Sequence, residues 1–344
     1  MTTGGGNKGN VVVMWKVNAG RRSKFAADFS DLSIVAIGWR EIGDPTRFAR
    51  KADLLAAIAE AYPDHSSRQA EVSANQIWRF LKEVKEGDDV ITYDPLDRVY
   101  LIGRIMGAPD YKPDIIEELP TCRAVEWTGR ASRDSLSDTA RNALGAILTL
   151  FLVREEVARE LEQVAATPVG EIVIARPQAL DDETEAASDP FETIEEQALE
   201  RIKDRLMGLG WDDMQEIVAA LLRALGYRTI ISPAGPDRGK DILASRDGFG
   251  FESPRIVVEV KHRKGAMGAP EIRAFLGGRH TDDRGLYVST GGFTREAHFE
   301  AERASTVTHL MTLDGLARAI VDNYDKMDER GRKLLPLTRL YWPS

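Results

Sequence analysis

An acidic and a basic side chain lie two residues apart in an apolar stretch of the sequence. The run from Ile256 to Lys261 reads IVVEVK and has the β-branched character of a buried strand. Successive strand side chains point to opposite faces, so Glu259 and Lys261 share one face and the apolar residues share the other. Another carboxylate, Asp241, ends a glycine-rich turn shortly before this strand. Together, these groups could hold a divalent cation beside a negatively charged substrate.

The residues around this strand have the pattern of an α/β domain. A helix is predicted over 211–225, because its apolar residues recur at helical spacing and Gly226 can end it. The order of elements predicts an α/β sandwich. Further helices are predicted at 191–207, 270–276, 295–304 and 313–324, and strands at 227–232, 241–245, 255–261, 285–289 and 307–311.

The residue pattern of the N-terminal half predicts a separate small domain of mixed α+β type around a curved sheet. Its predicted strands lie at 11–15, 32–39, 90–93, 99–105 and 123–127, and its helices at 50–62, 74–86 and about 135–165. We therefore divide the chain into a disordered start, a first domain, an acidic linker with a connecting helix, a second domain and a tail docked by its apolar end. These segments are 1–10, 11–165, 166–200, 201–325 and 326–344.

Length and composition limit the class of protein. A chain of 344 residues is longer than one ordinary domain, and 43% hydrophobic residues can form real cores. The single cysteine, Cys122, excludes an internal disulfide framework and a multi-cysteine zinc site, and fits a reducing cytoplasm. The apolar run 143–153 is too short to cross a bilayer and is interpreted as a core helix. We expect a cytoplasmic protein with no membrane partner.

The net charge of −9 does not argue against a nucleic-acid partner, because it is concentrated in one segment. Residues 181–200 contain nine acidic residues and no Lys or Arg. Residues 201–344 contain 23 basic and 20 acidic residues, which leaves the second domain slightly positive. The acidity therefore belongs to the predicted linker.

Four segments of the second domain resemble a known family. They read MQEIVAALLRALGY at 214–227, GPDRGKD at 235–241, VEVKHR at 258–263 and GLYVSTGGFTREA at 285–297. In this order they resemble the opening helix, acidic turn, catalytic strand and a later strand and helix of the Mrr-type restriction endonuclease domain. That family belongs to the PD-(D/E)xK nucleases. The resemblance implies a restriction-endonuclease-like α/β sandwich that hydrolyses phosphodiester bonds in DNA.

The resemblance also implies a metal site. Asp241, Glu259 and the backbone carbonyl of Val260 would hold Mg²⁺ or Mn²⁺, which lowers the pKa of a bound water and contacts phosphate oxygen. Lys261 would orient or activate that water. Gln215 stands where the family often has glutamate, so it could orient a water or ligand but adds no charge. Metal affinity therefore depends on the two remaining carboxylates.

A plainer interpretation of these residues also exists. Glu259 and Lys261 could be an exposed pair on an edge strand, because an isolated E-x-K is a common pattern. Asp237, the other acid in the turn, is interpreted as a turn-stabilising residue. The order of the four segments favours the active site over the exposed pair.

Cations around the predicted site could follow a phosphate backbone. The nearest are Arg238 and Lys240 before it, and Arg263 and Lys264 after it. Each is typical of a solvated surface charge, but together they predict salt-dependent binding to DNA. Further cations in the same region are Arg246, Arg255 and Arg279.

A weaker resemblance concerns the first domain. The segments IGW at 37–39, VKEGDDVITY at 84–93 and YLIGRI at 100–105 are similar to the helix, turn and strands of PUA-like barrels, including the EVE type. This resemblance implies a PUA-like barrel that binds nucleic acid and, in some members, a flipped or modified base.

Four aromatic residues of the first domain could supply stacking faces for a modified base or a small-molecule ligand: Trp15, Trp39, Trp78 and Tyr93. They could equally be core residues. For Trp78, on an apolar helix stripe, the pattern favours the core. For Trp39, beside a glycine and a charged loop, neither interpretation is favoured.

Three hypotheses remain. The first is a Mg²⁺-dependent endonuclease that restricts modified DNA, with an N-terminal reader and a C-terminal cutter. It would be a homodimer, because a double-strand break needs two active sites. The second is a defence nuclease whose first domain senses a small molecule or a partner. The third is a DNA- or RNA-binding protein whose nuclease fold no longer cuts.

Overall fold

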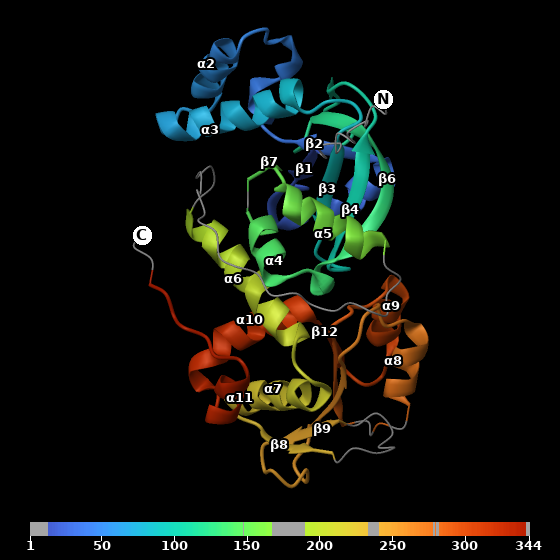
Figure 1. Ribbon diagram of the computed structural model, residues 1–344. Helices are drawn as coiled ribbons and strands as arrows, with labels where there is room; N and C mark the ends of the chain where they lie inside the picture. Colours follow the sequence, from blue (N-terminus) through green and yellow to red (C-terminus); the bar gives the residue numbers. More distant parts are fainter. Residues whose placement is uncertain are drawn as a thin grey trace, which may run out of the picture. The chain divides into compact units, whose positions relative to one another are not determined.

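The computed structural model of the chain describes residues 13–146, 148–166, 190–232, 241–277, 279 and 282–341 (Figure 1). It divides into two compact units, Met1–Ile194 and Glu195–Ser344. Each unit has its own sheet and its own apolar cores. The predicted disordered start and residues 167–189 of the acidic linker lie outside the described residues.

The described residues of the first unit contain a seven-stranded sheet in the order β2-β6-β4-β3-β1-β7, with β5 paired to β6 outside this path. β1 and β3 run parallel, and the other neighbouring strands run antiparallel. The strands are β1 (Met14–Val17), β2 (Ile34–Ile37), β3 (Asp89–Asp94), β4 (Val99–Ile105), β5 (Asp110–Tyr111), β6 (Thr121–Ser132) and β7 (Leu150–Leu152).

Helices cover both faces of this sheet. Trp15 and Val90 belong to a core shared with α1, α2 and α3, whereas Met14 and Ile91 belong to a core shared with α4 and α5. The helices are α1 (Ala26–Leu32), α2 (Lys51–Ala61), α3 (Ser67–Trp78), α4 (Asp138–Leu144) and α5 (Glu155–Ala166). Shorter helical turns are η1 (Arg21–Ser23), η2 (Arg40–Ile42), η3 (Pro45–Arg47), η4 (Arg79–Glu83) and η5 (Arg133–Ser135).

The curvature of this sheet depends on Gly103. The register between β4 and β6 shifts at Ile102 and Gly103, which marks a bulge. A Cβ atom at Gly103 would lie 2.6 Å from Val125 Cγ1 and 2.7 Å from the Glu126 carbonyl oxygen. Only glycine lets the long strand β6 pass this closely, and the sheet curves as a half-barrel (Figure 1).

The second unit is the predicted α/β sandwich. Its described strands form one sheet in the order β12-β11-β10-β9-β8, with β10, β11 and β12 parallel and β8 and β9 antiparallel to their neighbours. The strands are β8 (Arg228–Ile231), β9 (Ile242–Ser245), β10 (Ile256–Lys261), β11 (Arg284–Ser289) and β12 (Thr308–Thr312). The helices are α6 (Pro190–Met207), α7 (Trp211–Ala224), α8 (Ala269–Leu276), α9 (Arg295–Arg303), α10 (Leu313–Asn323) and α11 (Glu329–Leu334), with a 3₁₀ turn η6 (Tyr324–Lys326).

The two faces of this sheet have different coverings. Val258 and Val260 of β10 pack in a core with α7 and α10. On the opposite face, Tyr287 of β11 packs in a smaller core with residues of α8 and α9. The second face is the one that carries Glu259 and Lys261, because these residues alternate with Val258 and Val260 along the strand.

Two sequence predictions about secondary structure are wrong. The single helix expected at about 135–165 consists of α4, β7 and α5, so the apolar run 143–153 is not a core helix. Leu150–Leu152 instead pairs with β1, and the formation of so short an edge strand depends on its distant partner.

In the described part of the chain, no helix has the length and apolar character needed to span a membrane.

The tail is held differently from the prediction. Leu340 and Tyr341 are exposed, so the apolar end of the chain does not dock at these two residues. Leu335, directly after α11, is fully buried in the same core as α7. The docking segment is therefore α11, which the sequence analysis did not predict.

Candidate active site

Asp241 and Glu259 lie opposite one another on neighbouring strands. The antiparallel register pairs Ile242 with Val258, which places the residue before β9 opposite Glu259 on the same face of the sheet. The backbone N–H of Asp241 donates to the Val258 carbonyl at 2.9 Å. Their exposed fractions are only 5% and 7%, so two carboxylates are buried side by side.

Lys261 contributes a positive charge to this pair. Its Nζ atom lies 2.7 Å from Glu259 Oε1, and its side chain is 36% exposed, which leaves it open to a bound substrate. Burial raises the pKa of Glu259, and the hydrogen bond and charge of Lys261 oppose that shift. The nearby charge of Asp241 raises the same pKa further, as expected for two carboxylates that share a site.

Arg279 is a further cation that the structure brings to this face. Its guanidinium lies over the Phe275 ring at 4.4 Å, and its Nε donates to the Phe275 carbonyl at 2.6 Å. Phe275 packs edge-on against Tyr287 at 5.1 Å between ring centres, and Tyr287 is in register with Glu259. Burial lowers the pKa of Arg279, whereas the charges of Glu259 and Asp283 raise it.

The sequence analysis placed Arg279 only among the general cations of the region. Arg279 stands 20 residues after Glu259, and no sequence motif links the two residues. Only the packing of α8 against β11 brings it into electrostatic reach of the carboxylate.

Several buried polar atoms near these residues have no hydrogen-bond partner among the described residues. They include the Tyr287 hydroxyl and the Ser289 hydroxyl. Tyr287 and Ser289 are the register partners of Glu259 and Lys261 on β11, so both lie on the face of the carboxylates. Buried polar atoms without partners are rare in native structures and mark places where water or a ligand binds.

Gln215 itself is 2% exposed on α7, a helix that packs against β8 and β9. Among the described residues, no hydrogen bond or ion pair joins it to Asp241 or Glu259. The catalytic role expected for Gln215 therefore stays a prediction.

The donor set fits a hard divalent cation. Two carboxylates with the Val260 carbonyl nearby offer oxygen ligands, and Mg²⁺ takes its remaining ligands from water and phosphate. No cluster of three or more His, Cys, Asp and Glu side chains suited to a metal occurs within the described ranges.

The residues that follow β10 have mixed surroundings. His262 Nε2 lies 2.9 Å from the Leu209 carbonyl, so the ring is attached to the segment before α7. Arg263 is exposed and forms a 3.6 Å ion pair with Glu271, and Lys264 is exposed. The other predicted DNA-contacting cations, Arg238 and Lys240, lie outside the described residues.

The four aromatic residues predicted for an N-terminal pocket do not share one site. Trp15 and Tyr93 are 6% and 7% exposed and lie in different cores on opposite faces of the sheet. The reason is register: Trp15 pairs with Val90, and Tyr93 is three residues further along β3, so it points to the other face. Trp15 also donates from Nε1 to Asp88 at 3.0 Å. Trp39 and Trp78 are half-buried and pack against the core of Trp15.

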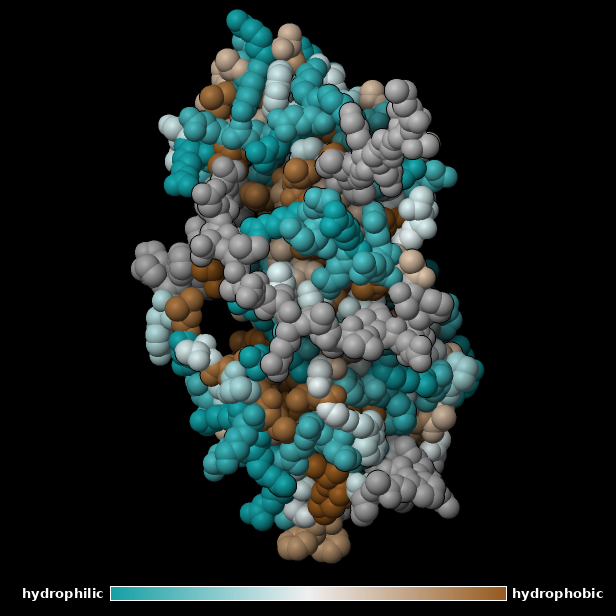
Figure 2. All heavy atoms as spheres, in the orientation of Figure 1, coloured by the Kyte–Doolittle hydropathy of each residue, from teal (hydrophilic) through white to brown (hydrophobic). Residues whose placement is uncertain are grey.

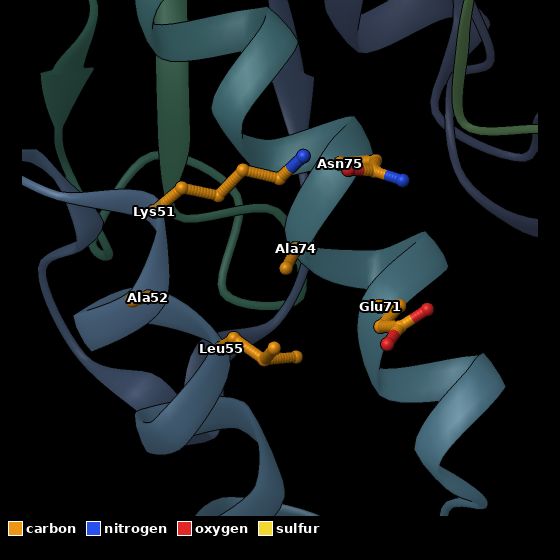
Figure 3. Close-up of a pocket in the computed structure, with 6 residues that line it drawn as sticks. All are labelled: Lys51, Ala52, Leu55, Glu71, Ala74 and Asn75. Atoms are coloured by element: carbon orange, nitrogen blue, oxygen red, sulfur yellow. The ribbon is translucent and has the colours of Figure 1, made fainter.

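The first unit has a cleft elsewhere. Figure 3 shows this cleft between α2 and α3, with Lys51 extending from one helix toward Asn75 of the other. Its volume is about 390 Å³. Its lining combines apolar and polar side chains, which suits a small ligand with both kinds of group. The lining residues are Lys51, Ala52, Leu55, Glu71, Ala74 and Asn75.

Comparison with known families assigns the second unit. Residues 206–320 match the family model Mrr_cat, described as "Restriction endonuclease". The chain therefore carries an Mrr-type restriction endonuclease domain, as the four sequence segments predicted. Residues 15–150 match a family described as "Domain of unknown function (DUF8426)". The PUA-like resemblance of this unit is not confirmed.

Individual relatives are distant. An uncharacterized protein, y4cE, of Sinorhizobium fredii (strain NBRC 101917 / NGR234) is 30% identical over 98 residues, which are 27% of this chain and 25% of that protein. The chain thus spans about a quarter of the curated relative that it matches.

Two solved structures are also similar. One is MspJI restriction endonuclease in complex with a 27-mer oligonucleotide: 14% identity, 88% of this chain, 72% of that chain and a TM-score of 0.31. The other is the DNA modification-dependent restriction endonuclease AspBHI: 16% identity, 87% of this chain, 77% of that chain and a TM-score of 0.31. TM-scores of this size do not establish a shared fold.

Proposed function

We propose that this protein is a Mg²⁺-dependent DNA endonuclease that restricts modified DNA, with Asp241, Glu259 and Lys261 as its catalytic residues. The observation that carries the proposal is their arrangement. Two buried carboxylates lie opposite each other, and a half-exposed ammonium lies 2.7 Å from one of them. All three belong to the restriction endonuclease domain.

The chain's own groups divide the chemistry between them. The carboxylates of Asp241 and Glu259, with the Val260 carbonyl, would hold Mg²⁺ or Mn²⁺. When bound, the ion lowers the pKa of a water and neutralises charge on the phosphate. Lys261 orients the attacking water and stabilises the negative charge that develops on the phosphoryl oxygens. Arg279, held rigidly on Phe275, adds a second positive charge on the same face.

The two-unit organisation supports a reader and a cutter in one chain. The first unit has two apolar cores of its own, and we propose that it recognises the modified base. Cutting both strands needs two active sites, and we therefore propose a homodimer.

A second candidate function is a defence nuclease that a small molecule or a partner activates. The α2–α3 cleft favours it, because Lys51, Glu71 and Asn75 line it together with apolar side chains. In this alternative, cleavage depends on a ligand of the first unit and not on DNA modification.

Cleavage of methylated, hydroxymethylated and unmodified plasmid with Mg²⁺, by wild type and by Lys261→Ala, tests these proposals. Cutting of modified DNA alone, lost in the variant, supports a modification-dependent enzyme. Equal cutting of every plasmid contradicts the reader and favours the regulated nuclease. Absence of cutting by the wild type, together with tight DNA binding, favours a binding protein that no longer cuts.

A further inference from the structure

Two exposed phenylalanines lie together on the loop between β9 and β10. Phe249 and Phe251 are 72% and 87% exposed, and their rings stack with centres 5.9 Å apart and planes 20° apart. Figure 2 shows hydrophobic side chains protruding at the foot of the view, where Figure 1 places this end of the β8–β9 hairpin. Adjacent large apolar side chains that face water indicate a binding surface.

The loop holds these rings in a fixed arrangement. The Asp247 carboxylate accepts hydrogen bonds from four successive backbone N–H groups, at residues 249 to 252, over 2.8–3.1 Å. Ser245 Oγ accepts two more, from Gly248 and Gly250. A loop tied by six hydrogen bonds loses little entropy when it binds, so its aromatic pair is prepared for a partner.

The loop lies on the catalytic face of the sheet. Arg228 pairs with Ser245, and Leu243 pairs with Val257, so these residues share the face of Asp241 and Glu259. The loop folds over that face, because a Cβ at Gly248 would meet the Arg228 side chain at 2.7 Å and one at Gly250 would meet Leu243 at 3.3 Å. Both glycines have a positive φ, which other residues adopt rarely.

The start of this loop lies a few base-pair steps from Asp241 along β9. Ser245 and Asp241 are four residues apart along one extended segment, or about 13 Å at ~3.3 Å per residue. That is about four base-pair steps of B-DNA at ~3.4 Å each. Arg228 and Arg246, both exposed, flank the rings and form no ion pair with other residues in the described part of the chain.

We propose that the loop 246–252 stacks Phe249 and Phe251 against bases of the DNA substrate, a few base pairs from the cut, while Arg228 and Arg246 contact its phosphates. Aromatic rings bind any base through its flat face, so this contact adds affinity and unstacks a base without reading sequence. The proposal rests on the proposed nuclease function, because DNA is the partner that the catalytic face implies.

The test measures binding of a short duplex to the full-length protein carrying Lys261→Ala, so that the duplex stays intact. On this background, we expect Phe249→Ala with Phe251→Ala to weaken binding about tenfold or more. The slope of affinity against salt should not change, because no charge is lost. Arg246→Gln should instead reduce that slope by about one.

Three controls accompany these variants. Phe249→Tyr with Phe251→Tyr should retain the affinity of the parent, since tyrosine keeps the aromatic face. Val307→Ala, which truncates an exposed side chain at the opposite edge of the sheet, should bind like the parent. A duplex with 2-aminopurine at successive positions should gain fluorescence at one or two sites, and lose that gain in the double alanine variant.

Defined results overturn the proposal. Unchanged affinity and unchanged 2-aminopurine signal in the double alanine variant do so, even if the wild type cuts DNA. Another such result is a change from dimer to monomer in sedimentation, with an equal loss of affinity for every duplex, wherever its 2-aminopurine lies. This result assigns the rings to a contact between two copies. Continued cutting by Lys261→Ala contradicts the proposed active site but not the stacking. A parent protein that binds no DNA overturns both.

Discussion

The Oδ2 atom of Asp241 accepts a 2.6 Å hydrogen bond from the backbone N–H of Val260, the residue between Glu259 and Lys261. This carboxylate oxygen therefore takes the place of the backbone carbonyl that accepts such an N–H in a regular sheet. The same bond also fixes the orientation of the second carboxylate oxygen. This contact couples the acid before β9 to the centre of β10. It fixes the position of the Asp241 carboxylate against the backbone of β10, directly beside Glu259.

Asp241→Asn separates the charge of this residue from its structural role. Asparagine can still accept the bond from Val260, so thermal stability should change little, while cleavage should fall about a hundredfold or more because a metal ligand loses its charge. Asp241→Ala should also cost about 1–3 kcal/mol of stability, since it leaves a buried N–H without a partner. Plasmid cleavage rates and unfolding curves measure the two effects. Normal cleavage by the asparagine variant would contradict the metal role.

Lys261→Ala should abolish cleavage and leave DNA binding largely intact. The side chain is needed where charge develops on the phosphate, and it is only one of several cations on this surface. Lys261→Arg should recover little cleavage, because a planar guanidinium cannot occupy the position of a compact ammonium. Single-turnover cleavage and duplex binding separate the two properties. Equal losses of binding and cleavage would indicate that the residue holds DNA only.

Gln215→Glu should lower the Mg²⁺ concentration needed for half-maximal cleavage, if this side chain faces the metal as the family resemblance implies. A third carboxylate would add charge to a site that otherwise has two. Gln215→Leu is the matched control: it fills the same space without an oxygen ligand, so it should not lower the Mg²⁺ requirement. An unchanged metal requirement in the glutamate variant would show that Gln215 acts elsewhere.

Arg279→Ala should lower kcat and should change KM less than kcat. The guanidinium lies on the catalytic face, within electrostatic reach of Glu259. It is held there by the ring and the carbonyl of Phe275. Arg279→Lys keeps the charge and should retain part of the rate. A larger effect on KM than on kcat would instead assign the residue to ground-state DNA binding.

Asp328 should make the stability of the second unit depend on pH. Its Oδ1 accepts the Gly331 N–H at 2.9 Å at the start of α11, and its Oδ2 pairs with Arg223 of α7. The hydrogen bond from Arg223 lowers the pKa of Asp328, although burial opposes the shift. Its contribution is therefore complete above the unfolded pKa of about 3.9 and disappears as pH falls through the lower folded value.

Asp328→Asn tests this relationship. At neutral pH it should lower stability by about 0.5 kcal/mol, since the ion pair is partly exposed and asparagine can still cap the helix. The difference between variant and wild type should shrink as pH falls below about 4. Chemical unfolding at neutral and acidic pH measures it. A difference that stays constant with pH would assign the effect to packing of α11 and not to charge.

The sequence by itself determined the elements that carry the chemistry. Alternation along IVVEVK separated Glu259 and Lys261 from the apolar face, and the 2.7 Å ion pair shows both side chains on one side of β10. The helix at 211–224 and the strands of the second domain were predictable for the same reason, because their residue patterns are local. The restriction endonuclease domain was predictable because four short motifs occur in order.

Only the tertiary structure decided which distant residues meet. Strand register placed Asp241 opposite Glu259 and separated Trp15 from Tyr93, and a shift of one residue would reverse either result. Pairing with β1 made Leu150–Leu152 a strand within an apolar run that local periodicity favours as a helix. Packing of α8 brought Arg279 to the catalytic face, and the folded loop directed two phenylalanines into solvent. These outcomes depend on contacts between segments far apart in the chain, which no local pattern encodes.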